Sequence, residues 1–205
     1  MSHYLILDFE TNGIDAGALP CTNYPMQVSA ILTDAQGQTV DTYTTLIAGA
    51  TSVNEWVSNN CTHLSVKKCE REGVEFREVL STLARMVNSD DTILVAHNLR
   101  YDYDMVLKPI AKMLNLERTD EFVALSRLRR FCTSINKANW DNDTCYYYKK
   151  LGKRMGPSLQ KLAKRLFIKT DGFKSHNSEH DVELTRRCLA GMIERAEVVV
   201  NGDYA

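Results

Sequence analysis

The chain has 205 residues, of which 44% are hydrophobic, and its 25 Lys and Arg nearly balance its 26 Asp and Glu. This length and composition suit one domain with a substantial core, and the near-neutral total excludes a histone-like or highly charged binder. The charge is unevenly distributed. Residues 127–174, here called the basic block, hold thirteen Lys or Arg against three Asp or Glu, a net charge of +10, while the remainder carries −11. Such a block can face a polyanion or form an ordinary solvated surface.

The sequence lacks the features of an exported or membrane-embedded protein. No stretch approaches the ~18 apolar residues of a membrane-spanning helix, and residues 1–7 lack the charged start of a signal peptide. We therefore expect a cytoplasmic protein with no membrane partner and with reduced cysteines. Cys61, His63 and Cys69 offer zinc-ligating groups, but their spacing fits no common zinc site.

The first half of the chain predicts an antiparallel meander followed by helices. An apolar strand over 4–7 ends in a polar segment, and the β-rich segments 26–33 and 39–47 are separated by residues typical of a hairpin turn. We expect a short helix over 54–61. The apolar residues of 76–87 recur at helical spacing and predict an amphipathic helix.

The second half predicts alternating strands and helices. The expected elements are a strand over 92–96, a helix over 101–114 kinked by Pro109, an ambiguous segment over 121–132 with a strand near Phe131, a helix over 159–167 and a long helix over 179–198. The last helix should bury Val182, Leu189, Ile193 and Ala196. This order indicates one α/β domain with a mixed sheet covered by helices.

Carboxylates follow two of the predicted strands. Asp8 and Glu10 are alternate residues at a strand end, so they project to the same side. Asp102 falls in the first turns of the helix after the 92–96 strand, with Asp104 on another face. Converging carboxylates favour a cation between them, and Mg²⁺ takes oxygen ligands. The same residues also fit a polar strand end and a charge that is stabilised near a helix N-terminus.

A third polar segment precedes the last helix. His176 and Asp181 would diverge by ~140° on one helix, but they converge if His176 lies in the loop and Asp181 in the first turn. Ser178 would then be the N-cap, and Asp181 could serve as the carboxylate of a capping box. His180 is close enough to exchange roles with His176.

These segments together resemble the DEDD-type 3′→5′ exonucleases, in the branch with a catalytic histidine. The matching motifs are Asp8-x-Glu10, His97-Asn98-x-x-x-Asp102 and His176-x-x-x-x-Asp181. The resemblance covers residues 4–193 and includes the segments 61–65 and 157–163. Three motifs in order, on suitable elements, are more specific than any one of them. Cys132-Thr133 departs from the Asp-Thr of many members, outside the metal set.

The resemblance implies a single exonuclease domain over 1–205, with a motif-bearing core at about 4–193 and a short C-terminal tail. Its mixed five-stranded sheet would be ribonuclease H-like and flanked by helices. Two Mg²⁺ or Mn²⁺ ions would be held by Asp8, Glu10, Asp102 and Asp181, and they would neutralise about four negative charges. His176 would accept a proton from the attacking water, and the products would be nucleoside 5′-monophosphates released from 3′ ends.

Further residues are candidates for binding the substrate. Thr11 follows the first motif and Asn98 belongs to the second, and Leu64 matches an apolar residue that packs against the terminal base in relatives. Tyr147, Lys149 and Lys150 combine a stacking ring with cations, although the tyrosines of 146–148 could equally pack a loop onto the core. The basic block lies between the second and third motifs, which favours a substrate-facing surface.

The expected partner is the 3′ end of a single-stranded DNA or RNA, with DNA slightly favoured, and a polymerase is a further candidate partner. The alternatives are an RNA 3′→5′ exonuclease, a catalytically silent subunit bound to a polymerase, and a metal-dependent hydrolase of small nucleotides. The five intact motif residues disfavour a silent subunit, because a purely structural role would not need all of them. The basic block disfavours a small-nucleotide substrate.

Overall fold

The computed structural model describes residues 2–13, 23–61, 63–87, 89, 91–136, 138–139, 146–148, 153–174 and 176–199. In chain order the elements are β1 (Tyr4–Thr11), β2 (Pro25–Thr33), β3 (Thr39–Leu46), α1 (Glu55–Asn60), α2 (Val66–Glu72), α3 (Phe76–Met86), β4 (Ile93–Ala96), the π-helix η1 (Arg100–Leu107), α4 (Lys108–Met113), α5 (Asp120–Arg127), β5 (Arg129–Cys132), β6 (Tyr146–Tyr148), β7 (Lys153–Met155), α7 (Leu159–Arg165) and α8 (Ser178–Glu194).

Five strands form a mixed sheet in the order β3-β2-β1-β4-β5. The strands β1, β2 and β3 pair antiparallel, as the predicted meander requires, whereas β4 runs parallel to both β1 and β5. Parallel neighbours need crossover connections, which the helices between β3 and β5 provide. The predicted α/β fold with a mixed five-stranded sheet is therefore confirmed. A separate antiparallel hairpin joins β6 and β7.

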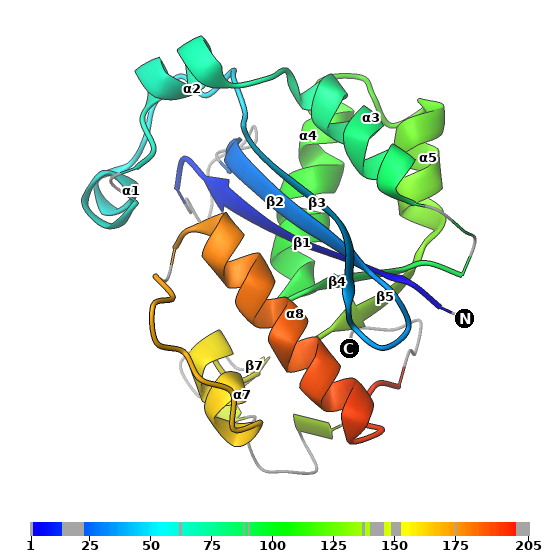
Figure 1. The fold of residues 1–205 in the computed structure, drawn as a ribbon. Helices are drawn as coiled ribbons and strands as arrows, with labels where there is room; N and C mark the ends of the chain where they lie inside the picture. The colour runs from blue at the N-terminus through cyan, green and yellow to red at the C-terminus, as the bar shows by residue number, and fades with distance from the viewer. Residues whose placement is uncertain are drawn as a thin grey trace.

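Helices cover both faces of the sheet (Figure 1). The helices α3, α4 and α5 pack on one face, and α7 and α8 pack on the other. The odd-numbered residues 5–9 of β1 belong to the first core, and the even-numbered Tyr4 and Ile6 belong to the second. Because side chains alternate along a strand, Asp8 and Glu10 continue the second series. The sheet thus carries both carboxylates to the face that α8 covers.

One of the expected element boundaries was wrong, and one expected helix is a π-helix in its first half. The first strand does not stop at residue 7, because β1 keeps pairing with β2 as far as Thr11 and a register shift follows Glu10. The helix predicted over 101–114 is the π-helix η1 followed by α4. Leu107 and Lys108 both have helical dihedral angles, so α4 continues directly from η1 and Pro109 lies at the junction of the two.

The start of α8 also differs from the expectation. Its N-cap is Asn177, whose side chain accepts a hydrogen bond from the backbone N–H of His180, so Ser178 is the first helical residue. Asp181 therefore does not close a capping box with Ser178. At the other end, Ala196 follows the helix with a φ of 55° and is exposed, so it does not join the inner face.

The groups considered for zinc each have another contact. The Cys61 thiol faces Glu10, the Cys69 thiol lies 3.5 Å from the carbonyl oxygen of Met26, and Nε2 of His63 lies 3.2 Å from Oε1 of Gln27. Among the described residues, these three do not form a metal-ligating group. No helix in the described part of the chain has both the length and the apolar character needed to cross a membrane.

Candidate active site

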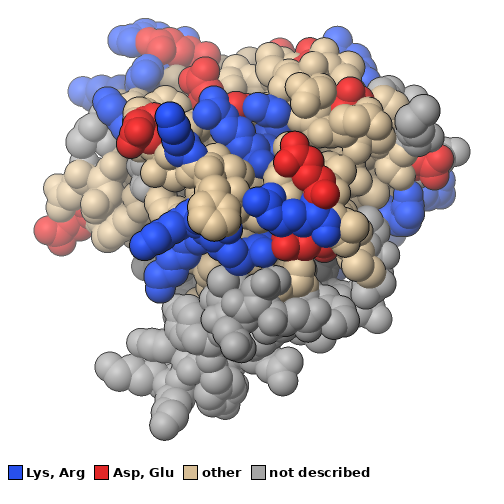
Figure 2. Space-filling model, turned by 60° about the horizontal axis from the view of Figure 1, so that its bottom comes forward, with Lys and Arg blue, Asp and Glu red and all other residues tan. Residues whose placement is uncertain are grey.

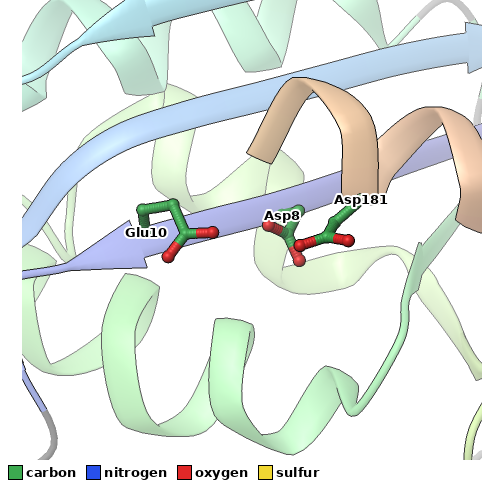
Figure 3. A group of neighbouring side chains, drawn as sticks. All are labelled: Asp8, Glu10 and Asp181. Carbon is green, nitrogen blue, oxygen red and sulfur yellow. The ribbon is translucent and has the colours of Figure 1, made fainter. Parts of the chain in front are cut away.

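Two elements far apart in the sequence bring three carboxylates together. Asp8 and Glu10 come from β1, and Asp181 comes from the first turn of α8. One ligand oxygen from each residue lies within 4.8 Å of the others, and Figure 3 shows the Asp8 and Asp181 side chains meeting between strand and helix. This arrangement could hold a divalent cation, because hard cations take converging carboxylate oxygens.

The N-terminus of α8 is fixed to the sheet by buried hydroxyls. The Oγ atoms of Ser178 and Ser29 share a hydrogen bond of 2.8 Å, and both side chains are fully buried. Ser29 lies opposite Asp8 in the β1–β2 register. Thr44 of β3 donates a further hydrogen bond to Ser29 at 3.0 Å. The first turn of the helix, and with it Asp181, is thereby held over the middle of β1.

Asp102 approaches the same strand from the other side. It lies in the first turn of η1, directly after the loop that leaves β4, and its Oδ1 accepts the backbone N–H of Phe9 at 3.0 Å. Asp102 is 2% exposed. It lies outside the 4.8 Å group of Asp8, Glu10 and Asp181 and has one oxygen engaged by the backbone. Short π-helical segments often occur at functional sites, and this one presents a predicted metal ligand.

Burial and mutual repulsion make these carboxyls unusually hard to ionise. The pKa of Asp8 is raised well above its usual range, first by burial and then by the charges of Asp102, Glu10 and Asp181. Burial and Asp181 raise the pKa of Glu10 to about 7, and burial raises that of Asp102 to about 8. Burial also raises the pKa of Asp181, against the opposing effect of the His176 backbone N–H. A bound cation would remove this repulsion, so the donor set fits a divalent metal.

We expect divalent cations to stabilise the protein more at pH 8 than at pH 5. The unfolded pKa values of Glu10 and Asp102 are 4.5 and 3.8, and folding raises both. The folded state therefore binds more protons, so the stability of the metal-free protein falls as pH rises from about 4 to about 8. Metal binding must displace those protons at low pH. At 100 times Kd, Mg²⁺ or Mn²⁺ should contribute about 2.7 kcal/mol, or roughly 5–10 °C in Tm.

Thermal melting in EDTA, MgCl₂ and MnCl₂ at both pH values measures this effect. Replacement of the exposed Asp171 by Asn is a matched control that should preserve the metal-dependent shift. An equal shift at pH 5 and pH 8, or no shift with either metal, would contradict the interpretation of the carboxylates as a cation site.

The two neighbouring histidines have different surroundings. His176 lies in the loop before α8 and lines the cavity beside the carboxylates. Its backbone N–H donates a hydrogen bond to Oδ2 of Asp181 at 2.9 Å. His180 lies within α8, and its Nδ1 accepts the backbone N–H of Lys174 at 2.9 Å. Its ring also packs against Phe173. The predicted convergence of a loop His176 with a helical Asp181 is thus what the structure shows.

His97, the first residue of the second motif, has both ring nitrogens within hydrogen-bond distance of neighbouring segments. Its Nδ1 lies 3.0 Å from Oγ1 of Thr133, and its Nε2 lies 3.1 Å from the carbonyl oxygen of Pro157. Burial lowers its pKa to about 4, so the ring stays neutral at physiological pH. It connects the end of β4 to the segment that precedes α7.

The structure brings some of the other predicted site residues to the cavity and not others. Thr11 and Asn98 line the cavity, and Oγ1 of Thr11 hydrogen-bonds the hydroxyl of Tyr101 at 2.7 Å. Leu64 is 5% exposed and packs in a small core with Val57 and Met26, so the structure does not bring it to the cavity.

The aromatic and basic candidates lie on or beside the second hairpin. Tyr147 belongs to β6, where it pairs with Arg154 of β7 in the backbone register. Lys149 and Lys150 lie outside the described residues. The expected contacts of these three side chains with the substrate therefore stay predictions.

The cavity has a volume of about 320 Å³ and includes residues that the sequence did not indicate. Trp56 of α1 and Tyr101 of η1 line it, and the Cys61 thiol lies 3.9 Å from Oε2 of Glu10 nearby. Tyr101 directly precedes Asp102, so its proximity was a usable indication. Trp56 has no neighbour in any motif and reaches the site only because α1 folds back toward β1.

A second hollow continues from the cavity. Its volume is about 510 Å³, and it shares His97, Asn98 and Tyr101 with the first. Its far wall is formed by residues 155–158, which connect β7 to α7. The hollow that contains the carboxylates therefore adjoins a second one, part of whose wall comes from the 127–174 segment.

Comparison with known proteins places this site in a family. The family model for exonucleases of the RNase_T type matches residues 5–189. The PolC-type DNA polymerase III of Thermotoga maritima is 25% identical over 191 residues, and that of Thermotoga petrophila is 24% identical over the same length. Each match covers 93% of this chain but 12% of the polymerase.

Solved structures show the same fold. Escherichia coli exonuclease I in complex with a dA16 oligonucleotide superposes with a TM-score of 0.66 at 16% identity, and exonuclease I of Methylocaldum szegediense with a TM-score of 0.65 at 16%. In both cases the match covers 95% of this chain and 41% of the other. The match of the family model across most of the chain shows that this protein belongs to the RNase_T exonuclease family.

Proposed function

We propose that this protein is a metal-dependent 3′→5′ exonuclease that hydrolyses terminal phosphodiester bonds and releases nucleoside 5′-monophosphates. The observation that carries the proposal is the convergence of Asp8, Glu10 and Asp181 at a cavity that also contains His176. Membership of an exonuclease family supports the reaction class. The family match over 5–189 also supports the interpretation of residues 4–193 as one exonuclease domain.

Each polar residue has a role in this proposal. Asp8, Glu10, Asp102 and Asp181 would hold two Mg²⁺ or Mn²⁺ ions, which when bound polarise the phosphate and lower the pKa of water. A ring nitrogen of His176 accepts a proton from the attacking water as its oxygen bonds to phosphorus. The bond from phosphorus to the leaving O3′ breaks, and O3′ takes up a proton. Thr11 of β1 and Asn98 of the turn between β4 and η1 orient the terminal nucleotide.

The substrate we favour is single-stranded DNA. Exonuclease I of Escherichia coli has been solved with dA16 and dT13 oligonucleotides, and the relatives in Thermotoga are DNA polymerases. The hollow that continues from the cavity offers a path for the nucleotides upstream of the 3′ end. RNA is the alternative, because nothing in the carboxylate set selects the sugar. A polymerase partner is a further proposal, supported by the PolC-type relatives.

Digestion of matched DNA and RNA tests the proposal. Single strands of one sequence, labelled at the 5′ or at the 3′ end, would be incubated with the protein and Mg²⁺, Mn²⁺ or EDTA. We expect metal-dependent release of mononucleotides from the 3′ end, faster with DNA. Release from the 5′ end, internal cleavage, or no cleavage by protein that binds the strand would reject the proposed reaction. The last result would instead indicate a silent binding subunit.

The basic block contributes to a positive surface. Lys161, Lys164 and Lys169 on or after α7 are exposed, and Arg165 is partly buried in an ion pair with Glu197. Figure 2 shows this side of the molecule, where Lys and Arg side chains gather, with Asp and Glu interspersed among them. A surface of this kind attracts a phosphate backbone and releases counterions when it binds.

Neutralising part of this block should weaken substrate binding and flatten its salt dependence. The test variant replaces Lys149, Lys150, Lys153 and Arg154 by Gln. Each contact with a single-strand phosphate adds about −0.7 to the slope of log K against log salt, so four contacts account for a change of up to about 3. Fluorescence anisotropy with a labelled oligonucleotide in EDTA measures the slope.

The matched control removes four charges from another surface. It replaces Lys67, Arg71, Arg77 and Arg85, which lie exposed on α2 and α3. We expect this control to keep the wild-type slope. If both variants change the slope equally, the effect comes from net charge and the basic block is not a specific binding surface.

A further inference from the structure

An aromatic contact joins α1 to the loop before α8. The rings of Trp56 and His176 have centroids 4.7 Å apart and an interplanar angle of 87°, which is the edge-to-face geometry that aromatic pairs favour. Both residues line the cavity that contains Asp8, Glu10 and Asp181. Trp56 is 49% exposed, so part of its indole faces the cavity or solvent while part contacts the histidine.

The helix that carries Trp56 is itself anchored to the strand that carries Asp8. The backbone N–H of Asn54 donates to the carbonyl oxygen of Asn12 at 2.9 Å, just after the end of β1. The side chain of Asn54 then caps α1 by accepting the N–H of Val57 at 2.8 Å. Val57 is buried in the core under this segment. Trp56 therefore projects from a backbone that is fixed relative to the carboxylates.

His176, by contrast, is held mainly through its backbone. Its N–H bonds to Asp181, and its φ of 63° is an uncommon left-handed value for a residue other than glycine. Within the described part of the chain, no group hydrogen-bonds the ring nitrogens of His176. An exposed ring without hydrogen bonds can change rotamer freely, whereas a proton acceptor must stay within hydrogen-bond reach of the water.

We propose that Trp56 is a positioning residue that holds the His176 ring toward the carboxylates. The edge-to-face contact with the indole restricts the ring, so the backbone bond to Asp181 and the contact with Trp56 together define its orientation. This inference rests on the proposed function, in which His176 accepts the proton. It predicts that Trp56 affects the rate only through His176.

A double-mutant cycle tests this dependence. Trp56→Ala should lower kcat about three- to tenfold, the range expected for loss of one aromatic pair, and should leave KM nearly unchanged. Trp56→Phe, which keeps a ring at the contact, should retain most of the rate. On a His176→Ala background, Trp56→Ala should have no further effect. Met113→Ala, at a similarly exposed site on α4, is the control for a nonspecific loss.

Fluorescence provides a readout that does not require activity. The chain has two tryptophans, so in a Trp140→Phe background the emission comes from Trp56 alone. His176→Ala should change that emission, and His180→Ala should leave it unchanged. Unchanged emission in both variants would show that Trp56 and His176 are not in contact in solution, which would overturn the inference.

The kinetic outcomes separate this inference from the proposed function. If Trp56→Ala lowered the rate further on the His176→Ala background, or raised KM, the positioning role of Trp56 would be overturned. Trp56 would then contact the nucleic acid directly. If the wild-type protein released no mononucleotides, the proposed function itself would fail.

Discussion

Replacement of Asp8 by Asn is expected to lower the rate of mononucleotide release by about 10³-fold or more, without loss of the fold. The charges of Asp102, Glu10 and Asp181 all act on Asp8 and raise its pKa, after burial. Asn keeps the shape but removes the negative charge that would bind a cation. The same change removes a buried carboxyl that is costly to ionise, so the metal-free variant should melt no lower than the wild type.

The measurement is single-turnover digestion of a labelled DNA strand in Mg²⁺, together with thermal melting in EDTA. Asp104 supplies a matched control, because it lies two residues beyond Asp102 on η1 and is exposed. Asp104→Asn should retain the wild-type rate. Near-normal turnover by Asp8→Asn, with contaminating nuclease excluded, would remove the carboxylate site from the mechanism.

Replacement of His176 by Ala should lower kcat by about 10²- to 10⁴-fold, the range associated with loss of a general base. His180→Ala should keep the rate within about twofold of the wild type. The reason lies in their contacts. His176 lines the cavity, whereas Nδ1 of His180 accepts the backbone N–H of Lys174 and its ring packs on Phe173.

Steady-state kinetics at saturating Mg²⁺ would compare the two variants. Circular dichroism and melting would show whether His180→Ala loosens the loop at 173–174. Equal losses in both variants, or a larger loss in His180→Ala, would mean that the proton acceptor is misassigned. A loss confined to KM in His176→Ala would indicate that this residue binds the substrate and does not move a proton.

Local sequence patterns were enough to predict most of the fold. The apolar runs of β1, β2 and β4 and the helical periodicity of α3 each specify one element, because burial on one face requires a fixed spacing of apolar side chains. The alternation of Asp8 and Glu10 likewise placed both on one face of β1. The order of the elements then restricted the sheet to a mixed arrangement with helices on its faces.

Other local features depended on tertiary pairing. The first strand extends through Asp8 and Glu10 because β2 pairs with it antiparallel as far as Pro25. The position of α8 over β1 depends on the buried contact between Ser178 and Ser29, whereas its start at Ser178 follows from the capping side chain of Asn177. Neither contact leaves a pattern in the nearby sequence.

The sequence by itself indicated which chemistry to expect, because the motifs that contain Asp8, Glu10, Asp102, His176 and Asp181 resemble those of an exonuclease family. Only the tertiary structure decided how these groups meet. It distinguished His176 from His180, buried Leu64 away from the cavity, and brought Trp56 against the His176 ring. The physical reason is that residue type and local spacing set which groups can react, whereas contacts between distant segments depend on the packing of the whole chain.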